Sequence, residues 1–193
     1  KLFKDVLTHR LSTPEDKNYA LYMLARIKFA LCLFKEADSL MRKASESSNL
    51  NAANDALELS LVLGLSGKDS LSLCKYAGAE KKLESGKFKE AAEEFLMLAD
   101  SDIFFTLRQS AEIKYIEALI ALGYYDVAVL RINNKINGNE IKIFGDKMLF
   151  LLSKIYLYGQ KNKPEAERNL RGFLVQFPQS PYINEVRDLL KNL

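Results

Sequence analysis

The residues of this chain that could support nucleophilic catalysis or bind a metal ion are few and widely spaced. The sequence contains one histidine, His9, and two cysteines, Cys32 and Cys74. A nucleophile needs a base within hydrogen-bond reach, and a metal ion needs clustered ligands. We therefore interpret the cysteines as buried apolar residues, with a disulfide between them left open, and place His9 on the surface. The sequence predicts no catalytic residue, no metal site and no cofactor.

Paired acidic residues do not point to acid–base chemistry either. Glu93 and Glu94 are adjacent in a segment with helical periodicity. Neighbouring positions on a helix diverge by about 100°, so the two carboxylates do not converge on one substrate. We interpret them as part of a solvated helix face.

Composition indicates a folded helical chain and excludes two classes of partner. Of 193 residues, 48% are hydrophobic and 27% charged, with only four prolines and nine glycines. No run of alternating β-branched residues appears, which favours helices over strands. A net charge of +3 gives no basic field of the kind that nucleic acids need. The apolar run at 29–34 is too short to span a bilayer, so we expect neither nucleic-acid binding nor a membrane span.

The stretch SGKFKEAAEEF at 85–95 predicts the corner of a helical hairpin. Gly86 suits the end of a helix because, without a Cβ, it readily adopts a left-handed conformation. From Phe88 onward, Ala91, Phe95 and Leu98 fall on one face of a second helix. Alanine permits close approach of the two helices, which such a short turn makes antiparallel.

The same corner recurs along the chain, which is the signature of a repeat protein. The corner alanines are Ala37, Ala91, Ala128 and Ala166. The corner units lie near 19–47, 70–100, 106–136 and 146–177. The first interval is longer by about one helix, for which we assign an extra helix at 51–65. A capping helix is predicted at 181–193, with Ser180 as its N-cap, Pro181 at its first position and one apolar face.

These corners resemble the tetratricopeptide-repeat (TPR) family. The best unit places Ala79, Gly86, Phe88, Ala91, Phe95 and Leu98 at the family's signature positions. The first unit has Cys32 where glycine is usual, and no unit has the early tryptophan. The resemblance implies an all-α fold of antiparallel helical hairpins stacked in a right-handed solenoid of about 10–11 helices, forming a single domain over residues 1–193.

The C-terminal stretch FLVQFPQSPYINEVRDLL resembles a junction of bacterial TPR proteins, typified by outer-membrane-assembly lipoproteins and the Tol-Pal coordinating protein. That likeness favours the periplasm or cell envelope over the cytoplasm. The apolar face of residues 1–11 is typical of the second half of a hairpin. We therefore expect the sequence to be a segment of a longer protein.

In resembling proteins the first helices of the hairpins line a concave groove that binds a partner peptide or helix. The resemblance assigns six exposed groove positions here: Tyr22, Arg26, Tyr76, Glu80, Lys114 and Glu117. This mixture of aromatic and charged residues favours apolar anchors with a polar rim. The expected function is a non-enzymatic scaffold for protein–protein interaction. The alternative is a structural spacer or self-assembly module of a larger bacterial envelope protein.

Overall fold

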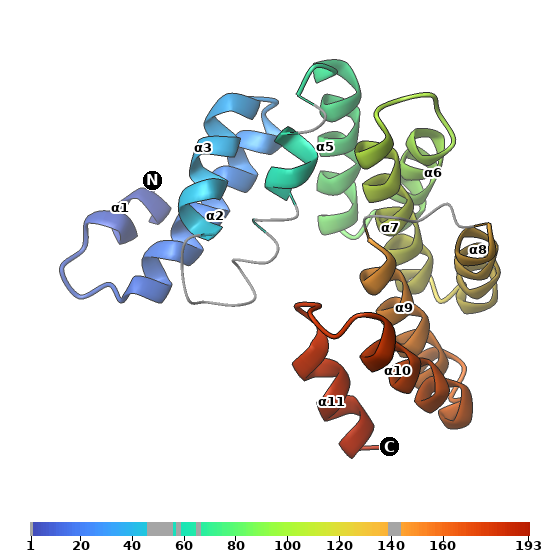
Figure 1. Ribbon diagram of the computed structural model, residues 1–193. Coiled ribbons are helices and arrows are strands. Elements are labelled where there is room, and N and C mark those ends of the chain that lie inside the picture. The colour runs from blue at the N-terminus through green and yellow to red at the C-terminus, as the bar shows by residue number, and fades with distance from the viewer. Residues whose placement is uncertain (1, 46–55, 57–58, 65–66, 139–143) are drawn as a thin grey trace. The chain divides into compact units, whose positions relative to one another are not determined.

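The computed structural model describes residues 2–45, 56, 59–64, 67–138 and 144–193 (Figure 1). Within these ranges all regular elements are helical, which confirms the predicted all-α class. The helices are α1 (Leu2–Thr8), α2 (Pro14–Ala30), α3 (Phe34–Ser45), α5 (Ser70–Glu84), α6 (Phe88–Ala99), α7 (Phe105–Ala121), α8 (Tyr125–Asn137), α9 (Gly145–Lys154), the π-helix η1 (Ile155–Gly159), α10 (Lys163–Gln176) and α11 (Ile183–Lys191). None of the helices in these ranges has the length and apolar character that crossing a bilayer requires.

Four corners between consecutive helices share one backbone geometry. In each, the residue two positions before the second helix is left-handed: Cys32 (φ 57°), Gly86 (φ 75°), Gly123 (φ 76°) and Lys161 (φ 55°). Five residues further on, each second helix buries an alanine completely: Ala37, Ala91, Ala128 and Ala166. Glycine adopts this conformation without a steric cost, whereas Cys32 and Lys161 adopt it against the preference of their Cβ atoms. The sequence spacing therefore corresponds to a repeated local geometry.

The described residues form two compact units, which we consider separately. The N-terminal unit comprises residues up to 81 together with 102–107, and the C-terminal unit comprises 82–101 and 108–193. A single continuous array over the whole chain stays a prediction.

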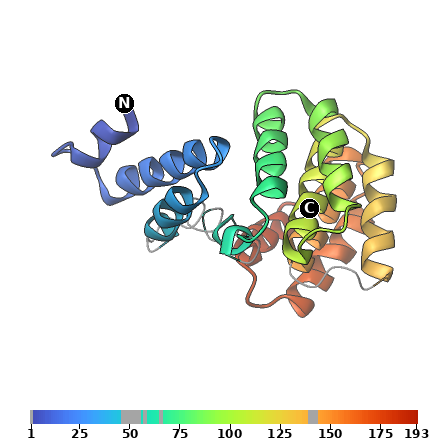
Figure 2. The same ribbon diagram turned by 90° about the horizontal axis from the view of Figure 1, so that it is seen from above.

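In the N-terminal unit, α2 and α3 lie side by side as a hairpin (Figures 1 and 2). Helix α2 begins after Thr13, whose hydroxyl accepts a hydrogen bond from the Asp16 N–H, while the Asp16 carboxylate accepts from the Thr13 N–H. This reciprocal cap satisfies two N–H groups that the first turn leaves without helical partners. The rings of Phe29 and Tyr76, both almost fully buried, meet edge to face at 6.2 Å and bring α2 and α5 into contact.

A disulfide joins Cys32, in the α2–α3 corner, to Cys74 of α5. Both residues are half-buried rather than enclosed in the core. The interpretation as two buried apolar thiols is therefore wrong, and the disulfide that the sequence left open is the arrangement found. Helix periodicity indicates which face of a helix is apolar and carries no information about a partner 42 residues away.

In the C-terminal unit, α9 runs into η1 and packs against α10. Gly159, at the end of η1, lies against the ring of Tyr125 so closely that a Cβ atom added there would come within 2.6 Å of the ring. Phe150 of α9 stacks on Tyr182 at 4.9 Å and meets Phe173 of α10 at 6.4 Å. These aromatic contacts connect α9, α10 and the residue that precedes α11 around a common apolar centre.

The segments predicted as helices at 181–193 and 51–65 both contain helix among the described residues. Helix α11 begins at Ile183, two residues later than predicted. The Ser180 hydroxyl accepts a hydrogen bond from the Tyr182 N–H at 3.2 Å and donates one to Asp146 at 2.7 Å. The prediction that this helix has one apolar face is confirmed, because Val186 is fully buried. The residues of the opposite, polar face are exposed: Asn184, Glu185, Arg187, Asp188, Lys191 and Asn192. Of the expected extra helix at 51–65, residues 56 and 59–64 are helical, and the remainder lies outside the described residues.

Candidate functional site

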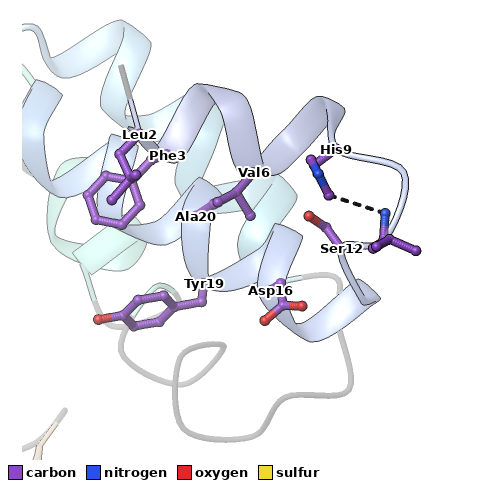
Figure 3. A pocket seen from close by; sticks show the side chains of 9 residues that line it. Leu2, Phe3, Val6, His9, Ser12, Asp16, Tyr19 and Ala20 are labelled. Carbon is purple, nitrogen blue, oxygen red and sulfur yellow. Dashed lines mark hydrogen bonds between the residues drawn. The ribbon is translucent and has the colours of Figure 1, made fainter.

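A pocket with a volume of about 320 Å³ lies at the start of the chain, between α1 and the first turns of α2 (Figure 3). Its lining is mostly apolar: Leu2, Phe3, Val6, His9, Leu11, Ser12, Asp16, Tyr19 and Ala20. The exposed fractions of Leu2 and Leu11 are 73% and 83%. Such exposure of two large apolar side chains beside one hollow leaves apolar surface that a partner could cover.

The pocket lining includes a serine, a histidine and an aspartate, the three residue types of a nucleophilic triad. A triad needs a hydrogen bond from Ser to His and another from His to Asp. Here His9 Nδ1 instead accepts a hydrogen bond from the Leu11 N–H at 3.3 Å (Figure 3). The Asp16 carboxylate accepts from the backbone and hydroxyl of Thr13, each at 2.9 Å, and these bonds lower the pKa of Asp16. The three side chains therefore do not form a charge-relay system.

The N-terminal unit holds four of the six predicted groove residues. Tyr22 and Arg26 are half-buried on α2, with the guanidinium 5.6 Å from the ring centroid. Glu80 is half-buried on α5. The exposed position predicted for Tyr76 is wrong, because its side chain is 1% exposed. Helix α5 also buries Leu73, Ala77 and Ala79, so its covered surface is too wide for Tyr76 to reach solvent.

The other two predicted residues are paired on α7 in the C-terminal unit. Lys114 Nζ lies 2.9 Å from Glu117 Oε2, and Lys147 Nζ of α9 lies 3.5 Å from Glu117 Oε1. Burial raises the pKa of Glu117, but the positive charges of Lys114 and then Lys147 outweigh it and hold that pKa below its ordinary value. The carboxylate therefore links α7 to α9. A single groove through the predicted residues of both units stays a prediction.

A second charged cluster in the C-terminal unit escaped sequence reasoning. Arg131 of α8 donates two hydrogen bonds to Glu112 of α7, at 2.7 and 2.8 Å, and a third to Asp100 at 2.8 Å. Its guanidinium also lies 5.6 Å from the ring centroid of Tyr115. The hydrogen bonds that Arg131 donates to the Glu112 carboxylate raise the pKa of Arg131. The carboxylates of Glu112 and Asp100 both accept hydrogen bonds from Arg131. The cluster therefore joins α8 to α7, and its carboxylates are unsuited to proton transfer.

One sequence signal could have revealed this cluster. Glu112 stands directly between Ala111 and Ile113, and all three residues are buried. An acidic residue flanked by apolar ones in a helix needs a cationic partner if it is covered. Nothing in the local pattern names that partner as Arg131, which lies on the next helix.

Among the described residues, no group of three or more His, Cys, Asp or Glu side chains could hold a metal ion. Comparison with known proteins gives no family assignment: no family model, no curated protein and no solved structure matches this chain.

Proposed function

We propose that this chain is a non-enzymatic protein-interaction scaffold, built of TPR-like helical hairpins, that binds an apolar helix or peptide of a partner protein. The observation that carries the proposal is the pocket between α1 and α2. Helix α1 buries none of its seven residues, although it carries Leu2, Phe3 and Val6 toward that pocket. A partner segment that covered this surface would remove apolar area from water, which is the main driving force of association.

The size and lining of the pocket favour a side-chain anchor over a cofactor. A volume of about 320 Å³ stands at the small end of the ~300–1,000 Å³ typical of ligand sites. Tyr19 is 51% exposed, and its ring meets Phe3 edge to face at 6.5 Å. An aromatic side chain with an apolar body and a polar hydroxyl suits the border of such a contact.

The repeated corners support the TPR-like architecture. Four left-handed residues at one spacing from four buried alanines make the hairpins alike in local geometry. The half-buried residues Tyr22 and Arg26 on α2 supply a polar rim for a groove in the N-terminal unit. A largely preformed surface lowers the ordering cost of capturing a partner.

The test is affinity capture with the full chain as bait from separate envelope and cytosolic extracts, quantified by mass spectrometry. Leu11→Glu places a charge at the pocket, and Val175→Glu is its matched control because Val175 is 81% exposed on α10. We expect one protein to be captured by the wild type and by Val175→Glu and to be lost with Leu11→Glu. A further variant, Arg26→Glu, tests whether the polar rim formed by Tyr22 and Arg26 contributes to partner binding.

Two other outcomes would redirect the proposal. A partner captured equally by all variants would exclude the pocket and the rim as the binding surface. Recovery of the bait alone, with a mass in sedimentation that rises with concentration, would favour the structural or self-assembly module instead.

A further inference from the structure

The α2–α3 corner places a cysteine where the backbone favours glycine. Cys32 has φ 57°, while the corresponding residues of the next two corners are Gly86 and Gly123, with φ 75° and 76°. A Cβ atom is disfavoured in this conformation. What cysteine supplies there and glycine lacks is the sulfur, which is bonded to Cys74.

A buried aromatic contact lies beside the bond. Phe29, one turn before Cys32, and Tyr76, two residues after Cys74, are both buried and have ring centroids 6.2 Å apart. The Cα atoms of the two cysteines are 5.5 Å apart, inside the range that a disulfide requires. The contact between Phe29 and Tyr76 therefore favours the approach of the two cysteines.

Neither cysteine is enclosed in the core. Both cysteines are half-buried, and their neighbours Leu31 and Leu71 are 62% and 68% exposed. Formation of the bond needs an oxidant, for which a low-molecular-weight disulfide or a thiol oxidoreductase is suited. In the reaction, one thiolate attacks the oxidant's disulfide and forms a mixed disulfide. The second thiolate then attacks this mixed disulfide and releases the remaining half of the oxidant. The protein gains one S–S bond, and the oxidant leaves as two thiols.

We propose that the Cys32–Cys74 disulfide is a staple that the working protein keeps, and that the chain functions in an oxidising compartment. Disulfides persist in such compartments and are rare where the thiol pool is reduced. Both cysteines of the chain are used in this one bond, which leaves no thiol for unwanted exchange. The staple holds the first hairpin against α5 and constrains the unfolded chain over a sequence separation of 42 residues. This inference does not depend on the binding function proposed above.

The first experiment refolds the reduced full-length chain in glutathione buffers that range from reducing to oxidising. Free thiols are trapped with an alkylating reagent and counted by mass. We expect one intramolecular disulfide at the poise of an oxidising compartment. Two alkylated thiols at that poise, or disulfide-linked dimers in place of the intramolecular bond, would overturn the proposal.

The second experiment measures thermal unfolding with and without dithiothreitol. The reductant should lower the midpoint of the wild type and leave Cys74→Ser and Cys32→Ser unchanged. Cys32→Gly should also be insensitive to reductant, yet unfold at a higher temperature than Cys32→Ser because glycine relieves the left-handed backbone. An oxidised wild type whose midpoint does not respond to reduction would contradict the role as a staple, even if the variants fail to fold.

Discussion

The two compact units connect their helices by different means. In the N-terminal unit, the first hairpin is joined to α5 by a covalent bond and by the buried rings of Phe29 and Tyr76. In the C-terminal unit, α7 and α8 are joined by the hydrogen bonds between Glu112 and Arg131. A disulfide acts mainly by restricting the unfolded chain, whereas a buried ion pair acts only when folding assembles it. Similar corners can thus be stabilised by contributions that respond to different conditions.

The largest expected effect is the loss of the disulfide. In the chain-entropy model, closing a loop of this sequence separation contributes about 4 kcal/mol to the free energy of unfolding. We expect dithiothreitol to reduce amide-exchange protection in α2, α3 and α5 while protection in α8 changes little. Equal loss of protection in both units would show that the staple does not act locally.

Removing Glu112 should be the next largest effect. Glu112→Ala leaves Arg131 with only part of its hydrogen bonds and should lower the free energy of unfolding by about 3 kcal/mol. The matched control is Glu167→Ala, whose partner Arg171 is largely exposed, with an expected change below ~0.5 kcal/mol. Denaturant unfolding measures both. Similar values for the two variants would mean that the buried pair contributes no more than a surface pair.

Replacing a glycine by alanine should have a smaller effect on stability, and its sign should differ between a corner and a helix interior. Gly123→Ala meets no atom within 4 Å but keeps φ 76°, so it should destabilise by about 1 kcal/mol. Gly78→Ala, equally unobstructed but inside helix α5, should stabilise by about 1 kcal/mol. Thermal unfolding of both variants provides the check. If Gly123→Ala were also stabilising, the left-handed requirement of the corner would be refuted.

The smallest effect concerns pH. The pKa of Glu117 is held below its ordinary value of 4.5 in the folded chain. A depressed folded pKa stabilises the fold above the unfolded pKa, and this contribution is lost as the pH falls through the folded value. The stability difference between wild type and Glu117→Gln should therefore be largest near neutral pH and shrink below about pH 4.5. Urea titrations at several pH values measure it, and a difference that grew on acidification would reverse the assignment.

Sequence reasoning predicted the features that depend on local geometry. Gly86 and Ala91 predict a corner, because a left-handed residue and a close approach of two helices are both local requirements. The Cys32–Cys74 bond was left open and the Glu112–Arg131 pair was missed, because each depends on a partner in another part of the chain. Tyr76 was misplaced for a related reason: a helix with apolar residues on several faces does not reveal how many of them its neighbours cover.

The close contact between Gly159 and the Tyr125 ring has a consequence for how this chain can change in evolution. Any larger residue at 159 requires the ring to move or to be replaced, while a smaller residue at 125 would leave space that a side chain at 159 could fill. The two positions, on η1 and α8, should therefore vary together.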